Sequence, residues 1–241
     1  MSSPSSRLAD LSIMEAPVAE ALSRRLGVQP THPALFEQAC VHSSFSAESG
    51  LASNQRLEFL GDAILDLVVA EHLFATHPEL DEGGLSKVRI AVVNETVLAE
   101  VARELNLGEL LVVGRGADAE GLRFKPSVLS DAFEAVLGAT YLSCGHDEVS
   151  RVILDLLGSR LEAAALAPGS EDYKSLMNEW AQAEHATMPV YEVEGSGPAH
   201  DRRYIATVSV NDAVLGSGEG RSKKASEMEA AKAAWGVVGH A

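Results

Sequence analysis

One long helical segment, residues 54–74, constrains the fold of this chain more than any other stretch. Its apolar residues recur at steps of three and four positions, the period of one helix face, and they include Leu57, Leu60, Ile64, Leu67 and Val68. Glu58 and Asp62 lie four positions apart in the same segment, each beside bulky apolar neighbours. On a helix this spacing stacks both carboxylates on one face, one turn apart. The segment therefore predicts a core-facing helix that carries two adjacent charges.

A second acidic pair occurs in VLSDAFEAVLGATYL, where Asp131 and Glu134 are three positions apart on another apolar helical segment. For either pair alone, the alternative is the solvated edge of an amphipathic helix. If the two helices face each other, four carboxylates come within about 5 Å and repel by roughly 3 kcal/mol per pair at an effective dielectric of about 20. Protons or cations must neutralise such a cluster, and oxygen-only ligands suit Mg²⁺ or Mn²⁺. The chemistry indicated is metal-assisted hydrolysis, on condition that the helices meet.

The composition is that of a folded globular protein. A length of 241 residues allows one large or two small domains, and 46% hydrophobic with 22% charged residues argues against wholesale disorder. The first residues lack the apolar run of a signal peptide, and no stretch approaches the roughly 18 apolar residues of a membrane span. Cys40 and Cys144 fit no metal or redox spacing. We therefore expect a cytoplasmic protein with two reduced, buried cysteines and no membrane partner.

The sequence pattern changes at LAPGSED, residues 166–172, where proline, glycine and serine stop an alanine-rich helix. Before this point helical periods dominate, and Asn94 is a plausible N-cap. The helices expected there are residues 34–44, 54–76, 85–91, 95–105, 128–143 and 148–165. The sequence predicts an all-α domain over residues 1–166, followed by a linker at residues 167–171.

A different pattern follows the linker. Residues 172–185 have a helical period, and MPVYEVEG and RRYIATVSVND then alternate in the manner of strands. AVLGSGEG forms a third short strand, and residues 222–238 close the chain as a helix. This order predicts a small α+β domain, α-β-β-β-α, over residues 172–241.

The formal net charge of −16 argues at first sight against a nucleic-acid partner. Basic residues after the linker are mostly gathered in three places, however, and one of them is the Lys223–Lys224 pair behind Ser222. A helix that begins at Ser222 offers free N–H groups and its positive dipole end to a phosphate, although a solvated helix end is the alternative for such a pair. GSGEGRSKK lacks the order of a P-loop, so we expect no nucleotide cofactor.

NQRLEFLGD, residues 54–62, closely resembles the signature of the ribonuclease III family. HSS at residues 42–44, EGGLSK at residues 82–87 and DAFEA at residues 131–135 agree with it, and the C-terminal domain resembles a double-stranded RNA-binding domain. The resemblance covers almost the whole chain. It implies a homodimeric, Mg²⁺-dependent endoribonuclease, with Mn²⁺ as a possible substitute, that cuts both strands of double-stranded RNA at a short stagger. The expected products carry 5′-phosphate and 3′-hydroxyl ends, and the expected substrates are ribosomal RNA precursors and other structured RNAs.

The resemblance also implies residue roles. Asp62 and Glu134 match the catalytic positions, and the four metal-site carboxylates are matched by Glu58, Asp62, Asp131 and Glu134. Phe59 matches an aromatic that enters a socket on the partner subunit, with an ordinary core phenylalanine as the alternative. Such RNA-binding domains touch two minor grooves and the phosphates between them, and the matching positions are Asn178, Glu179, His200, Lys223 and Lys224.

Two positions depart from the family pattern. Gln55 stands where glutamate is common, at a position tied to the subunit interface, and Asp66 adds a carboxylate where a neutral residue is expected. Two hypotheses of different class remain: the endoribonuclease, and a non-cleaving double-stranded RNA-binding protein on the same scaffold. The presence of all four carboxylates favours the enzyme, and the acidic net charge predicts salt-sensitive RNA binding.

Overall fold

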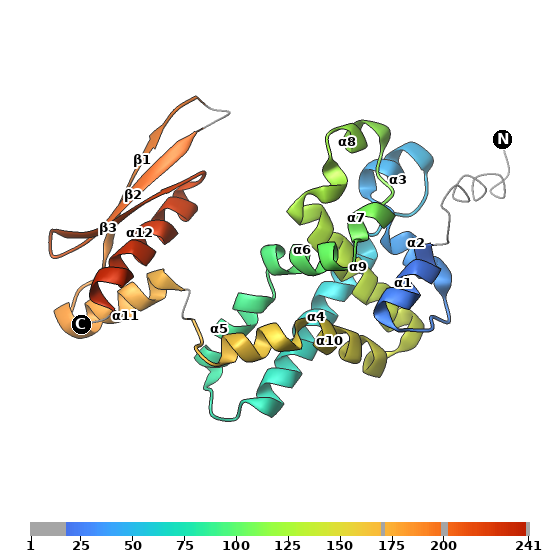
Figure 1. Ribbon diagram of the computed structural model, residues 1–241, viewed down its shortest axis with the longest axis horizontal. Coiled ribbons are helices and arrows are strands. Elements are labelled where there is room, and N and C mark those ends of the chain that lie inside the picture. The colour runs from blue at the N-terminus through green and yellow to red at the C-terminus, as the bar shows by residue number, and fades with distance from the viewer. Residues whose placement is uncertain (1–17, 170–171, 199–201, 240–241) are drawn as a thin grey trace. The chain divides into compact units, whose positions relative to one another are not determined.

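The computed structural model describes residues 18–169, 172–198 and 202–239 of the chain. The chain divides into two compact units, Met1–Leu166 and Ala167–Ala241. In the described residues the first unit is helical apart from one isolated β-bridge, and the second combines two helices with a three-stranded sheet (Figure 1). The predicted fold class, an all-α domain followed by an α-β-β-β-α domain, is confirmed.

The helices of the first unit include all the long ones that the apolar periods predict. Asn94 is an N-cap as expected, because its side chain accepts a hydrogen bond from the Val97 N–H. The elements are α1 (Val18–Leu26), α2 (Pro33–Ala39), α3 (Ser43–Ser49), α4 (Gln55–Thr76), α5 (Glu82–Val92), α6 (Glu95–Glu104), α7 (Leu107–Leu110), α8 (Arg115–Ala119), the 3₁₀ helix η3 (Leu122–Phe124), α9 (Pro126–Cys144) and α10 (His146–Ala165).

The single helix expected over residues 34–44 is wrong. Helix α2 ends at Ala39 and α3 begins at Ser43, and the segment between them pairs with Val112 instead. The Val112 N–H donates to the Cys40 carbonyl at 2.8 Å, and the His42 N–H donates to the Val112 carbonyl at 3.0 Å. A bond to a residue some 70 positions away thus replaces the local helical bond, and no local period reports it.

Helix α9 is the centre of the first unit. Twelve of its 19 residues are buried, and it packs against α2, α4, α6 and α10 (Figure 1). The core around it includes fully buried Phe36, Phe133, Leu65 and Leu157. A helix that is buried on nearly all sides has an almost continuously apolar sequence. Asp131 and Glu134 are therefore conspicuous in the sequence of α9.

Helices α4 and α9 cross with their backbones in direct contact. A Cβ atom at Gly61 would overlap the carbonyl oxygen of Glu134, and one at Gly138 would overlap the carbonyl oxygen of Leu57. Glycine inside a helix costs about 1 kcal/mol relative to alanine. The close crossing gives these two positions a reason to carry that cost, since only a hydrogen atom fits there.

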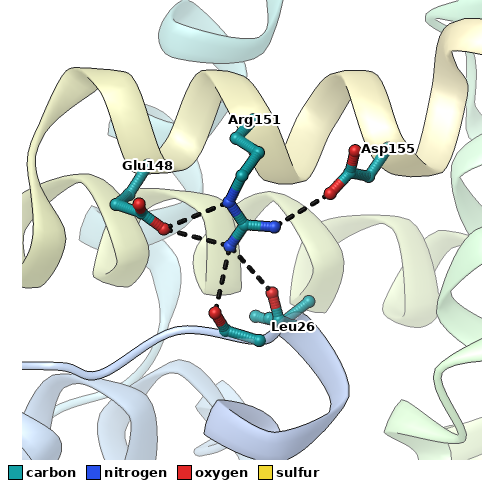
Figure 2. A network of polar contacts seen from close by, with 5 residues as sticks. Leu26, Glu148, Arg151 and Asp155 are labelled. Atoms are coloured by element: carbon teal, nitrogen blue, oxygen red, sulfur yellow. Dashed lines mark hydrogen bonds and ion pairs between the residues drawn. The ribbon is translucent and has the colours of Figure 1, made fainter.

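Arg151 of α10 ties the end of α1 to the rest of the helical unit (Figure 2). Its Nη2 donates to the carbonyls of Leu26 at 3.2 Å and Gly27 at 3.1 Å. Its other donors reach Glu148 and Asp155, one turn to either side on α10. A cation at the C-terminal end of a helix satisfies carbonyls that have no helical partner.

The second unit packs helices α11 (Tyr173–His185) and α12 (Lys223–Val238) with strands β1 (Val190–Ser196), β2 (Arg203–Val210) and β3 (Ala213–Gly220). The sheet is antiparallel in the order β1-β2-β3, and α12 packs against it (Figure 1). Gly216 and Gly218 of β3 lie so close to Ala230 of α12 that neither has room for a side chain. Ser222 caps α12 as expected, by accepting from the Ala225 N–H at 3.1 Å.

The helix crossing predicts opposite effects for two glycine-to-alanine changes. Gly138→Ala overlaps backbone that cannot move independently, so we expect the free energy of unfolding of the first unit to fall by about 1–3 kcal/mol or more. Gly158→Ala on α10 is the matched control, because a Cβ there meets no described atom within 4 Å. This control is expected to raise the free energy of unfolding by up to about 1 kcal/mol. Urea unfolding followed by circular dichroism measures both, and an unchanged midpoint for Gly138→Ala contradicts the crossing.

Candidate active site

The crossing of α4 and α9 gathers acidic side chains. Glu58 lies in the first turn of α4, and Asp131 and Glu134 lie on α9. One carboxylate oxygen from each of these three residues lies within 4.8 Å of the other two. The structure thus brings together three of the four carboxylates that the sequence singles out. Asp62 is exposed on the next turn of α4 and lies outside this group of three.

The same backbone contact that joins the helices places these acids. Gly61 precedes Asp62 and abuts the carbonyl of Glu134, while Gly138 abuts the carbonyl of Leu57, which precedes Glu58. Each acid on α4 is therefore adjacent in sequence to a point of contact with α9. A wider crossing would separate the acids of the two helices.

The cluster is electrostatically strained. Partial burial, followed by the charges of Asp62, Asp131 and Glu58, raises the pKa of Glu134 to about 8. Partial burial, followed by the charges of Asp131 and Asp62, also raises the pKa of Glu58. Like charges and low solvation both disfavour ionisation, and a bound cation reverses both effects. This group of carboxylates could therefore hold a metal ion.

Two residues that the sequence analysis gave no role also act on the cluster. Burial raises the pKa of Asp131, and the charge of Glu95 at the start of α6 raises it further, whereas His42 lowers it. Glu95 and His42 are distant from Asp131 in the chain, so no spacing connects them with it. The one sequence feature that points to His42 is the family match of HSS at residues 42–44. This match does not indicate that His42 interacts with Asp131.

Asp66, the additional carboxylate on α4, is paired. Its side chain lies 3.1 Å from Nη1 of Arg89 on α5, and both side chains are partly exposed. Asp66 contributes only the last of the charges that raise the Glu134 pKa. The cation of Arg89 thus compensates the departure from the family pattern at this position.

Several of the exposed side chains of α4 are large and apolar. Phe59 is 80% exposed, which excludes a core phenylalanine. Leu67 and Phe74 follow on the same helix with 49% and 78% exposure, and Ile90 on α5 is 64% exposed. Large apolar side chains that gather on one surface mark an interaction site. Gln55 is exposed at the start of this helix, and its side-chain oxygen accepts from the Ser53 hydroxyl at 3.4 Å.

The second unit holds four of the five RNA-binding candidates on two helices that pack together. Lys223 and Lys224 are exposed at the start of α12, and Asn178 and Glu179 lie on α11. Exposed lysines at a helix N-terminus place point charges beside free N–H groups. His200 lies outside the described residues.

A helical unit with a carboxylate cluster, followed by an α-β-β-β-α unit with lysines at a helix N-terminus, is the arrangement expected of a nuclease that acts on double-stranded RNA. A family model described as Ribonuclease-III-like matches residues 32–161, and one described as a double-stranded RNA binding motif matches residues 173–237. The chain belongs to the ribonuclease III family. It is an endoribonuclease with a double-stranded RNA-binding domain.

Sequence relatives and a solved structure agree with this family assignment. Ribonuclease 3 of Thermobifida fusca (strain YX) is 45% identical over 207 residues, which is 86% of each chain. Ribonuclease 3 of Heliobacterium modesticaldum is 47% identical over 214 residues, 87% of this chain and 91% of that one. The nuclease domain of ribonuclease III from Campylobacter jejuni, described with a flexible region involved in dimer formation, is 40% identical with a TM-score of 0.55. It covers 58% of this chain and 96% of its own.

In the part of the chain that the structure describes, none of the helices combines the length and the apolarity that crossing a membrane requires.

The raised pKa of Glu134 predicts how the stability of the metal-free protein depends on pH. The pKa of Glu134 in the folded protein, about 8, exceeds the ordinary glutamate value of 4.5. The contribution of Glu134 to the free energy of unfolding is therefore complete below pH 4.5, where the carboxyl group is protonated in both the folded and the unfolded chain. It is lost as pH rises toward 8, because the unfolded chain ionises first. We expect the melting temperature of the first unit in a chelator to fall from pH 5 to 9, and to fall less in Glu134→Gln.

Added Mg²⁺ is expected to reduce the fall in the unmutated chain, because a cation stabilises the ionised carboxylate. Thermal unfolding at five pH values, with chelator and with Mg²⁺, measures these slopes. Equal slopes for the unmutated chain and Glu134→Gln in chelator contradict the assignment.

Proposed function

We propose that the chain hydrolyses phosphodiester bonds of double-stranded RNA with Mg²⁺, as a homodimer that cuts both strands at a short stagger. The proposed products carry 5′-phosphate and 3′-hydroxyl ends. The observation that carries the proposal is the convergence of Glu58, Asp131 and Glu134 at the α4–α9 crossing. Membership in the ribonuclease III family supports it.

The donor set fits a hard divalent cation. Three carboxylate oxygens within 4.8 Å of one another can converge on one ion, and Mg²⁺ favours oxygen ligands and keeps several waters. Glu58, Asp131 and Glu134 would hold it, with Asp62 on the adjoining turn of α4, and Mn²⁺ accepts the same donors. When bound, such an ion polarises the phosphoryl group and acidifies water.

The proton transfers of the reaction are assigned to side chains of the protein. Hydrolysis forms a bond between a water oxygen and phosphorus, and breaks the bond from phosphorus to the 3′ oxygen. The water loses a proton and the 3′ oxygen gains one. We assign these transfers to the Asp62 and Glu134 carboxylates, whose charges interact across the crossing. A positioned carboxylate can accept a proton from the attacking water and pass one to the leaving oxygen.

We assign RNA binding to the second unit. Lys223 and Lys224 would contact phosphates, while Asn178 and Glu179 on α11 would face 2′-hydroxyls and His200 a minor groove. Recognition of this kind reads shape and backbone, so the proposed substrates are structured RNAs with long duplexes, ribosomal precursors among them. Equal cleavage of single-stranded RNA, or a binding constant unchanged between 50 and 200 mM salt, would contradict this assignment.

We assign the dimer interface to the exposed apolar face of α4. Phe59, Leu67 and Phe74 are exposed along that helix, and Ile90 of α5 is a further exposed apolar side chain. A self-complementary face of this kind suits a two-fold dimer. The nuclease domain from Campylobacter jejuni, whose structure is described with a region involved in dimer formation, supports the assignment.

Cleavage of an end-labelled RNA duplex by the purified chain is the direct test. In Mg²⁺ we expect both strands to be cut, and Glu134→Gln to slow cleavage about 100-fold or more because a proton-transfer group is removed. Glu20→Gln, at an exposed carboxylate on α1, is the matched control and should cleave normally. Gel-shift binding in Ca²⁺ should be equal for all three proteins. Binding without cleavage in Mg²⁺ or Mn²⁺ would instead identify a non-cleaving RNA-binding protein.

Removal of the most exposed aromatic should weaken the dimer. We expect the 25.5 kDa chain to sediment as a dimer, and Phe59→Ala to raise the dissociation constant by about 100-fold or more, since the two-fold dimer loses two phenylalanines that each contribute roughly 1.5–3 kcal/mol. Val237→Ala, at an exposed apolar residue of α12, should leave the dimer unchanged. A monomer at micromolar concentration would refute the interface.

A further inference from the structure

His42, which follows α2 and caps α3, has a side chain whose proton position is determined by its hydrogen bonds. The Ser44 N–H donates to Nδ1 of His42 at 3.1 Å. The Ser44 Oγ lies 2.9 Å from the same nitrogen, and it accepts from the Gly114 N–H at 2.9 Å. A backbone N–H can only donate, so Nδ1 must present its lone pair. The proton of the neutral ring is therefore on Nε2.

The backbone places His42 beside the start of α4. Val41, the preceding residue, accepts the Asn54 N–H at 2.8 Å, and Asn54 in turn accepts the Glu58 N–H at 2.9 Å. Two hydrogen bonds thus connect the peptide before His42 to a carboxylate-bearing residue of the site. The ring also interacts with the cluster: burial lowers the pKa of His42, and the charge of Asp131 opposes that shift.

This arrangement excludes one role and favours another. A metal ligand needs a free lone pair, and the available nitrogen of His42 carries a proton instead. The ionised carboxylates of the cluster are acceptors only, whereas the oxygens of a phosphodiester need donors. A neutral N–H beside an acidic cluster supplies a donor without adding a charge that would pair with the metal-binding oxygens.

We propose that His42 contacts the substrate, its neutral imidazole donating the Nε2–H to a non-bridging oxygen of the phosphodiester held at the acidic cluster. Ser44 and Gly114 act as positioning residues, because their hydrogen bonds set the tautomer and the orientation of the ring. The proposal rests on the proposed nuclease function and adds a residue to its substrate site. A preorganised donor that bonds to an oxygen that gains charge accelerates such reactions by about 10²–10³-fold.

Two amide variants separate this role from helix capping. His42→Asn keeps an acceptor at the position of Nδ1, which suits an N-cap, but carries no donor at the position of Nε2. His42→Gln does the reverse, because its amide nitrogen reaches the position of Nε2 while its acceptor no longer meets the Ser44 N–H. Asp81→Asn on α5 is the matched control for an N-cap change, since Asp81 caps that helix through the Gly84 N–H at 2.8 Å.

We expect His42→Asn to slow single-turnover cleavage in Mg²⁺ about 100-fold, with unchanged melting temperature, unchanged duplex binding in Ca²⁺ and an unchanged Mg²⁺ concentration for half-maximal rate. His42→Gln should melt at a lower temperature yet cleave within a few-fold of the unmutated chain below that temperature. Asp81→Asn should match the unmutated chain in every measurement.

Several results would overturn the proposal. If His42→Asn cleaves normally while the unmutated chain is active, this inference fails and the proposed function stands. A large shift in the Mg²⁺ concentration that His42→Asn requires would indicate that His42 belongs to the metal site. Loss of cleavage in His42→Gln but not in His42→Asn would indicate that His42 acts only as a helix cap. If the unmutated chain does not cleave duplex RNA, both proposals fail together.

Discussion

The contact of two helix backbones at Gly61 and Gly138 is the constraint on which the rest of the nuclease unit depends. Because neither position has room for a Cβ atom, α4 and α9 approach more closely than side-chain packing would allow. The central helix α9 is thereby held between α4 and the helices on its other sides. The position of every carboxylate in the cluster follows from this one approach.

The same approach creates an electrostatic conflict inside a stable fold. The pKa of Glu134 rises to about 8 because burial and the charges of four nearby acids oppose its ionisation. The apolar core holds the helices together, so the acids cannot move apart to relieve the repulsion. Arg89 beside Asp66 limits the repulsion at the edge of the cluster.

Local periodicity in the sequence predicted the long helices and strands of both units. It did not predict contacts between segments that are distant in the chain. Apolar periods predict α4, α9 and α10 because each must bury a face of its own. The break between α2 and α3 escaped prediction because Val112, far along the chain, supplies the bonds that end the helix. The effect of Glu95 on Asp131 was not predicted for the same reason. In the sequence, Glu95 is an ordinary acidic residue in the first turn of a helix.

The sequence by itself determined the order of the elements, the two-unit organisation of helices before strands, and the identity of four carboxylates on two apolar helices. Only the tertiary structure decided that Glu58, Asp131 and Glu134 converge, that Asp62 lies just outside them, that Phe59 faces solvent, and that the His42 ring presents its Nε2–H. The physical reason is that periodicity records which face of an element is buried, whereas the crossing of two helices and the partners of a ring nitrogen depend on residues that are remote in the chain.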